Sequence, residues 1–133
     1  MQEKLRIIIS GNVNRARYRE LILSAEDKLD RLAISYGDIV LWEVNIRAKK
    51  RFGQCRIMRE GCFAISIAAI MFQAENRFVE EVILHELLHS CAGCMGHGKQ
   101  WKSYAEQVNL AYGTHISRTG TREQYGLAGS GTE

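Results

Sequence analysis

Three stretches of the chain carry apolar residues at helical spacing, with polar residues on the opposite side. They are residues 15–36, 77–92 and 101–110. Each has hydrophobic side chains every three or four positions, which is typical of an amphipathic helix. Gly37 is expected to end the first helix, and Asn76 is the expected N-cap of the second. The pattern therefore predicts three helices.

Between the first two helices the pattern changes to alternation. Residues 39–46 are rich in β-branched and aromatic types and predict a strand. The side chains expected on its buried face are Val40, Trp42, Val44 and Ile46. Residues 52–57 and 62–70 flank a turn at residues 60–61 and predict a β-hairpin, and residues 5–9 predict a short strand. The fold class is therefore α+β, with helices packed on a small, mostly antiparallel sheet.

The length of the chain fits one domain. With 133 residues, 46% of them hydrophobic, it can bury one core and is too short for two. We expect the domain to occupy residues 1–117. Residues 118–133 contain glycines at four positions and few large apolar side chains, so we expect a flexible tail there.

The sequence shows no sign of a membrane or secreted protein. No segment has the roughly 20 consecutive apolar residues that cross a bilayer. The first apolar run, residues 7–9, is too short for a secretory signal. We therefore expect a cytoplasmic protein with reduced thiols. The alternative is a four-thiolate zinc site, which is less favoured because only one pair has C-x-x-C spacing among Cys55, Cys62, Cys91 and Cys94.

The chain is mildly basic, with a net charge of +3 and a sequence pI near 8.7. This lies below the pI of about 9 that indicates nucleic-acid binding from bulk charge alone. The basic residues cluster, however, in residues 15–19 and 47–59. Such clusters are usually solvated faces, and they can also follow phosphates. If DNA is a partner, the residues expected to contact it are Arg47, Lys49, Lys50 and Arg51.

The second predicted helix contains the sequence His-Glu-Leu-Leu-His at residues 85–89. Positions i and i+4 share one face of a helix, so the rings of His85 and His89 can reach one ion while Glu86 lies beside it. A plainer interpretation makes both rings solvated or hydrogen-bonded core residues. It is less favoured, because two imidazoles and a carboxylate on an apolar helix carry a desolvation cost unless they bind something. The motif therefore predicts a metal site.

A third histidine, His97, follows after a glycine-containing segment. Gly93 permits the backbone to end the helix and turn back. A catalytic zinc ion commonly takes three protein ligands and leaves its fourth position to water. The sequence therefore predicts a Zn²⁺ site formed by His85, His89 and His97, with Glu86 as the general base of a hydrolase.

Several motifs together resemble those of the SprT-like zinc metallopeptidase family. They span roughly residues 15–110 and comprise Arg51-Phe52-Gly53-Gln54-Cys55, Ala64-Ile65-Ser66-Ile67, Val82-Ile83-Leu84-His85-Glu86-Leu87-Leu88-His89 and His97-Gly98-Lys99-Gln100-Trp101-Lys102. Trp101 stands where the family commonly has phenylalanine.

This resemblance implies a zincin-like domain, in which helices back a small sheet whose edge strand lines the substrate cleft. It also implies that His85, His89 and His97 bind zinc and that Glu86 is the general base of an endopeptidase. The substrates would be proteins or peptides, and in relatives they are often attached to DNA.

Two other functions remain open. One is a zinc-containing DNA- or protein-binding module without peptidase activity, in which Cys91 or Cys94 fills the fourth position of a closed site. The other is a regulatory peptidase with a single protein target. The donor that stabilises the oxyanion is not assigned among Tyr104, Tyr112 and Lys99, and His115 is expected at the surface.

Overall fold

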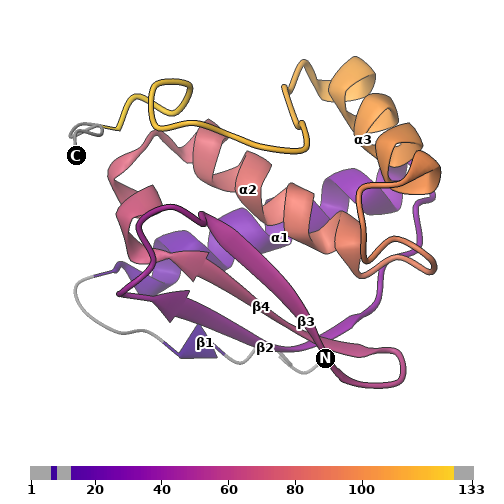
Figure 1. The fold of residues 1–133 in the computed structure, drawn as a ribbon, viewed down its shortest axis with the longest axis horizontal. Coiled ribbons are helices and arrows are strands. Elements are labelled where there is room, and N and C mark those ends of the chain that lie inside the picture. The colour runs from indigo at the N-terminus through magenta and orange to yellow at the C-terminus, as the bar shows by residue number, and fades with distance from the viewer. Residues whose placement is uncertain (1–6, 9–12, 128–133) are drawn as a thin grey trace.

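The computed structural model describes residues 7–8 and 13–127. In this part of the chain three α-helices cover a four-stranded sheet (Figure 1), which confirms the α+β class. The elements in chain order are β1 (Ile7–Ile8), α1 (Arg15–Arg31), β2 (Asp38–Asn45), β3 (Gly53–Arg59), β4 (Cys62–Ala68), the 3₁₀ helix η1 (Ala69–Gln73), α2 (Asn76–His89) and α3 (Lys99–Tyr112). β1 falls within the strand expected at residues 5–9, of which residues 5, 6 and 9 lie outside the described part.

The sheet is mixed, with the strand order β1-β2-β4-β3. β2 pairs in parallel with β1 and with β4, whereas β3 and β4 pair antiparallel. The expectation of a mostly antiparallel sheet is therefore wrong. The reason is the connectivity: α1 joins β1 to β2 as a crossover, and β4 enters the sheet between β2 and β3. The predicted hairpin is confirmed as β3 and β4, with Gly61 at φ 77° in its turn.

β2 contains a bulge at Val40, which has no partner in the register with β4. The bulge changes which side chains face the core, so Ile39 is buried and Val40 is only half-buried. Trp42 and Val44 are buried as expected. Ile46 lies beyond the end of the strand and is 55% exposed, so the predicted face is wrong at its two ends.

α1 ends at Arg31 and not at residue 36, although the apolar pattern continues. Ala33 has a left-handed backbone with φ 58°, and the N–H groups of Ala33 and Ile34 donate to carbonyl oxygens of the last turn, each over 3.0 Å. This is a Schellman ending. Ile34 is still buried, which explains why the pattern extends past the helix.

α2 begins at Asn76, with Glu75 as its N-cap. The predicted cap at Asn76 is therefore wrong by one residue, and the Asn76 side chain instead accepts a hydrogen bond from Arg17. α2 ends at His89, three residues before the predicted end. Residues 69–70, expected in a strand, belong to η1.

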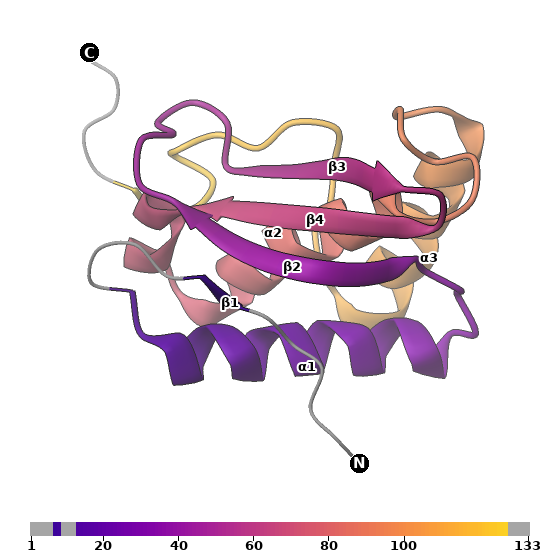
Figure 2. The ribbon, with the colours of Figure 1, turned by 90° about the horizontal axis from the view of Figure 1, so that it is seen from below.

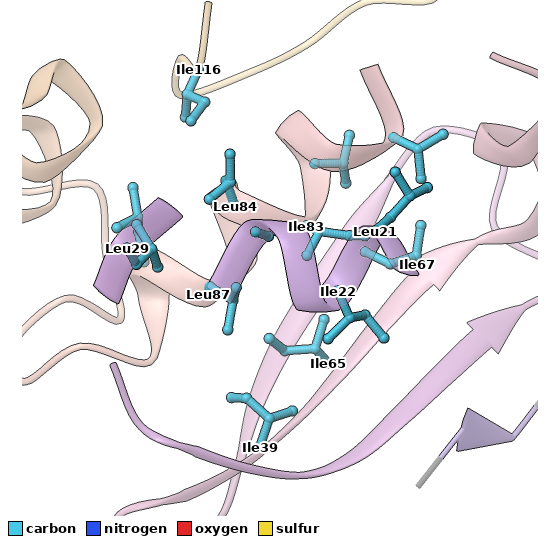
Figure 3. Packing of buried hydrophobic residues seen from close by; sticks show 14 of the residues in the cluster. Leu21, Ile22, Leu29, Ile39, Ile65, Ile67, Ile83, Leu84, Leu87 and Ile116 are labelled. Atoms are coloured by element: carbon cyan, nitrogen blue, oxygen red, sulfur yellow. The ribbon is translucent and has the colours of Figure 1, made fainter. Parts of the chain in front are cut away.

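The core lies between the sheet and helices α1 and α2, which cover the same face of the sheet (Figure 2). The side chains that meet there are fully buried and branched (Figure 3). They include Ile22 from α1, Ile65 and Ile67 from β4, and Ile83 and Leu87 from α2. This packing fixes the rotation of α2 about its axis and so decides which of its side chains point away from the core.

Arg17 connects α1 to the segment that leads into α2. Its Nη1 and Nη2 donate to the carbonyl oxygens of Phe72 (2.6 Å) and Ala74 (2.8 Å), and its Nε donates to Oδ1 of Asn76 (2.6 Å). Of the basic cluster at residues 15–19, Arg17 therefore stabilises the fold through these hydrogen bonds.

Residues 114–127, here called the C-terminal strap, run along α2 from the end of α3 toward the start of α2 (Figure 1). The backbone N–H of His115 donates to Glu81 on α2 over 3.2 Å. The buried side chains of the strap are Ile116, Tyr125 and Leu127. The expectation that residues 118–133 have little to bury is therefore wrong as far as residue 127, because apolar side chains anchor the strap to the core. Residues 128–133 lie outside the described part.

All four cysteines are free thiols, as expected. In the described part of the chain no helix is both long enough and apolar enough to cross a membrane.

Candidate metal centre

His85 and His89 lie one turn apart near the end of α2, and their rings point to the same place as that of His97. Nε2 of His97 is 3.1 Å from Nε2 of His89 and 3.2 Å from Nε2 of His85. Helix geometry aligns the first pair. A turn after α2, with Gly93 at φ 74°, brings the third ring to them.

The spacing of these three nitrogens fits a metal ion. Two ligands about 2.0 to 2.1 Å from a tetrahedral zinc ion lie about 3.3 Å from each other. The observed separations of 3.1 and 3.2 Å are close to this value. The three rings form the metal-ligand group found in the described residues, and neither Cys91 nor Cys94 belongs to it. The group that could hold an ion therefore offers three imidazoles, without the thiolate that a closed site would use.

A hydrogen bond holds the His89 ring in the orientation that metal binding needs. Nδ1 of His89 lies 2.8 Å from the carbonyl oxygen of Cys94. A carbonyl only accepts, so this nitrogen carries the proton and Nε2 keeps its lone pair. The backbone of Ser117 on the strap raises the pKa of His85 and so opposes the effect of burial. Trp101 of α3 packs against all three rings, 4.6 to 5.4 Å between centroids, and so joins α3 to the site.

The imidazoles are uncharged at neutral pH. Burial lowers the pKa of His85 to about 3, and the neighbouring rings of His89 and His97 act in the same direction. Burial also lowers the pKa of His89 and of His97. Neutral rings offer lone pairs, so the site is ready for a cation without first losing protons.

Glu86 is a buried carboxyl group beside the three rings. Its Oε2 lies 4.0 Å from Nε2 of His85, and the residue is only 5% exposed. Burial raises its pKa to about 8, and the nearby Arg51 acts in the opposite direction. Positive charge close to Glu86 therefore decides whether it is ionised at neutral pH.

Gly53 at the start of β3 lets the strand approach Glu86 closely. A Cβ atom at this position would lie 2.8 Å from Oε2 of Glu86 and 2.9 Å from Cγ1 of Val82. Both distances are too short for ordinary contact, so any side chain here would displace the carboxyl group. The contact with Glu86 thus explains on steric grounds why a glycine stands at residue 53 in the R-F-G-Q-C run.

The three rings and Glu86 open into a cleft of about 470 Å³. The residues that line the cleft come mainly from α2, from the first part of β3 and from the C-terminal strap. Figure 1 shows the course of these three elements. The residues that line the cleft from these three elements include Gly53, Gln54, Cys55, Glu81, Val82, His85, Glu86, His89, Ser117, Arg118, Thr119, Gly120 and Tyr125.

The structure brings together all four residues that the sequence assigned to the site, and it separates others. Tyr104, Tyr112 and Lys99 do not line the cleft, and the Tyr112 hydroxyl instead donates to the Lys28 carbonyl. His115 is exposed, as expected. Sequence reasoning missed the strap. The aromatic and apolar residues within its glycine-rich sequence were the signal for its packing.

The basic residues named as DNA contacts divide into two pairs. All four are exposed. Lys50 and Arg51 line the cleft, whereas Arg47 and Lys49 do not. Positive charge therefore lies on the rim of the cleft beside β3.

Comparison with known proteins adds a family assignment. The model of the SprT-like family matches residues 18–120, which include the three histidines and Glu86. No curated protein and no solved structure matches the chain.

Proposed function

The chain belongs to the SprT-like family, and on this premise we propose that it is a zinc-dependent endopeptidase with a zincin-like active site. The observation that carries the proposal is the convergence of three neutral imidazoles, with Nε2 atoms 3.1 and 3.2 Å apart. They lie beside the buried carboxyl group of Glu86, which is on the same helix as His85 and His89. Zinc is the metal that three imidazoles favour most readily among common hydrolytic cofactors.

In this proposal His85, His89 and His97 hold the ion, and Glu86 moves the proton. When bound, zinc supplies Lewis-acid chemistry, which lowers the pKa of water and polarises a carbonyl oxygen. Glu86 accepts a proton at its carboxylate from the attacking water and delivers it to the nitrogen of the leaving chain. Arg51 favours the ionised form of Glu86 that this role needs, and the absence of a side chain at Gly53 lets β3 lie against the carboxylate without displacing it.

The substrate in this proposal is an extended polypeptide that binds along β3. β3 is an edge strand, paired with β4 on one side, and its first residues line the cleft. An edge strand offers backbone N–H and C=O groups to which a peptide can add as a further strand. The exposed cations Lys50 and Arg51 on the rim favour proteins associated with DNA as substrates, since the same rim can meet phosphates.

The test is the Glu86→Gln variant of the zinc-loaded full chain. We expect it to keep its zinc and its fold, because the three ligands are unchanged, and to lose at least about 100-fold in the rate of casein cleavage, as for loss of a general base. Glu80→Gln is the matched control, since Glu80 lies on the same helix and pairs with Lys28 outside the cleft. His97→Ala should lose zinc, as measured by native mass spectrometry.

The outcomes separate the candidate functions. Cleavage by Glu86→Gln at the wild-type rate would remove Glu86 from the mechanism. A zinc-loaded wild-type protein that cuts neither casein nor a DNA-binding protein, with or without single-stranded DNA, would favour a binding module. Cleavage that occurs only when DNA is added would support DNA-associated substrates.

A further inference from the structure

Tyr125 is an aromatic residue of the C-terminal strap that lines the cleft and lies beyond the region matched by the family model, residues 18–120. We infer that its hydroxyl group donates a hydrogen bond to the carbonyl oxygen of the scissile peptide bond, as negative charge develops there. This inference rests on the proposed peptidase function.

The ring of Tyr125 is held at the end of the cleft nearest the start of α2. It packs edge-on against Phe52, which precedes β3, with centroids 5.4 Å apart, and in a tilted arrangement against Phe78 of α2 at 5.7 Å. Tyr125 is 8% exposed. Because rings from both neighbouring elements fix it, the direction of its C–O bond is also fixed.

The hydroxyl group reaches back toward the part of the strap that forms the cleft wall. A Cβ atom on Gly120 would overlap the Tyr125 hydroxyl, so the absence of a side chain at residue 120 makes the space that this hydroxyl occupies. Gly120 itself lines the cleft. The strap thus folds back on itself so that a polar group from residue 125 lies against its wall.

The electrostatic surroundings keep the hydroxyl protonated. Burial raises the pKa of Tyr125 to about 12, and the carboxyl groups of Glu81 and Glu86 act in the same direction. A phenol that retains its proton at neutral pH is a donor, and a donor fixed in place before the reaction stabilises an oxyanion without reorganisation.

The two arginines that line the cleft are less suited to this role. Arg118 is exposed on the strap, so water competes for its guanidinium group. Arg51 acts on Glu86, whose pKa it lowers. Tyr104, Tyr112 and Lys99 do not line the cleft. In the assigned role no covalent bond to Tyr125 forms or breaks, and its proton stays on the phenol oxygen throughout.

The experiment compares Tyr125→Phe with Tyr112→Phe in the zinc-loaded full chain. Each substitution removes one hydroxyl and keeps the ring, and the Tyr112 hydroxyl binds the Lys28 carbonyl at 3.1 Å, outside the cleft. For Tyr125→Phe we expect kcat on a casein-derived peptide to fall on the order of 100-fold with KM unchanged. We also expect weaker binding, by a similar factor, of a phosphinic peptide that mimics the tetrahedral intermediate. Tyr112→Phe should match the wild type in both.

Three outcomes would overturn the assignment. Tyr125→Phe could turn over at the rate of Tyr112→Phe, which removes the hydroxyl from the reaction. It could raise KM alone, which makes the hydroxyl a contact to the bound substrate that does not strengthen in the transition state. A wild-type protein without peptidase activity would sink the proposed function and this assignment with it, whereas an active wild type with an unchanged Tyr125→Phe sinks the assignment only.

Discussion

Glu81 is a buried carboxyl group that only half uses its hydrogen-bonding capacity. It is 6% exposed, and its Oε2 accepts the backbone N–H of His115 at 3.2 Å. Its Oε1 is buried without a hydrogen-bond partner among the described residues. An ionised carboxylate in this position lowers the stability of the fold. The size of this effect depends on pH, because pH decides how much of Glu81 is ionised.

That effect leads to a prediction for the metal-free protein. Burial raises the pKa of Glu81 above its usual value of 4.5, and the N–H group of His115, its imidazole and Arg77 oppose the shift. The native state therefore keeps a proton that the unfolded state has lost, and stability falls as pH rises above about 4.5. Since a glutamine side chain cannot ionise, the free energy of unfolding of Glu81→Gln relative to wild type should increase as the pH rises above about 4.5, as measured in urea titrations. A difference that is the same at every pH contradicts the prediction.

β3 and α2 form the part of the site in which backbone proximity matters most. Gly53 lies against Glu86 and Val82, with room for a hydrogen atom but not for a methyl group. β3 is anchored by its pairing with β4, and α2 by the core. Neither element can withdraw easily, so the Glu86 side chain has to give way when Gly53 is enlarged.

If the proposed function holds, we predict that Gly53→Ala retains zinc and the overall fold but loses on the order of 10- to 100-fold in kcat, because Glu86, the proposed general base, is displaced. Peptidase kinetics and metal content by mass spectrometry measure the two properties separately. Gly61→Ala serves as a comparison, because Gly61 lies in the distal hairpin turn and a Cβ atom there would meet no other atom within 4 Å. Because φ at residue 61 is 77°, which alanine adopts with strain, Gly61→Ala should lower the free energy of unfolding and leave kcat unchanged. A kcat of Gly53→Ala equal to that of the wild type would contradict the prediction.

At the scale of the whole molecule, Arg17 connects α1 to the segment that leads into α2. Its guanidinium group donates to two backbone carbonyl oxygens and one side-chain amide oxygen. The planar fork matches three acceptors at once, which an ammonium group does not. The contact joins residues 55 positions apart in the sequence, so it stabilises the tertiary arrangement and no single element.

We predict that Arg17→Lys lowers the free energy of unfolding by about 1 to 3 kcal/mol, because part-buried carbonyl groups lose their donors. Urea denaturation followed by circular dichroism measures the change. Arg15→Lys, at an exposed position of the same helix, should alter the free energy by no more than about 0.5 kcal/mol. Equal effects of the two substitutions would show that the hydrogen bonds of Arg17 add nothing to stability.

The sequence by itself determined what depends on neighbours along the chain. The helices follow from the spacing of apolar residues, and the pairing of His85 with His89 follows from the pitch of a helix. The β3–β4 hairpin follows from its turn. Each of these is a property of a short run of consecutive residues, so the local pattern predicts that the element exists, although α1 and α2 end earlier than the pattern does.

The tertiary structure alone decided which distant segments meet. The parallel pairing of β2 with β4, the contact of Gly53 with Glu86 and the packing of the strap on α2 join segments far apart in the sequence. Such contacts depend on how the apolar faces of all elements are buried at once, and one face can pack in several ways that the local pattern does not distinguish. The three histidines that converge were therefore readable in the sequence, whereas the cleft around them, including Tyr125, was not.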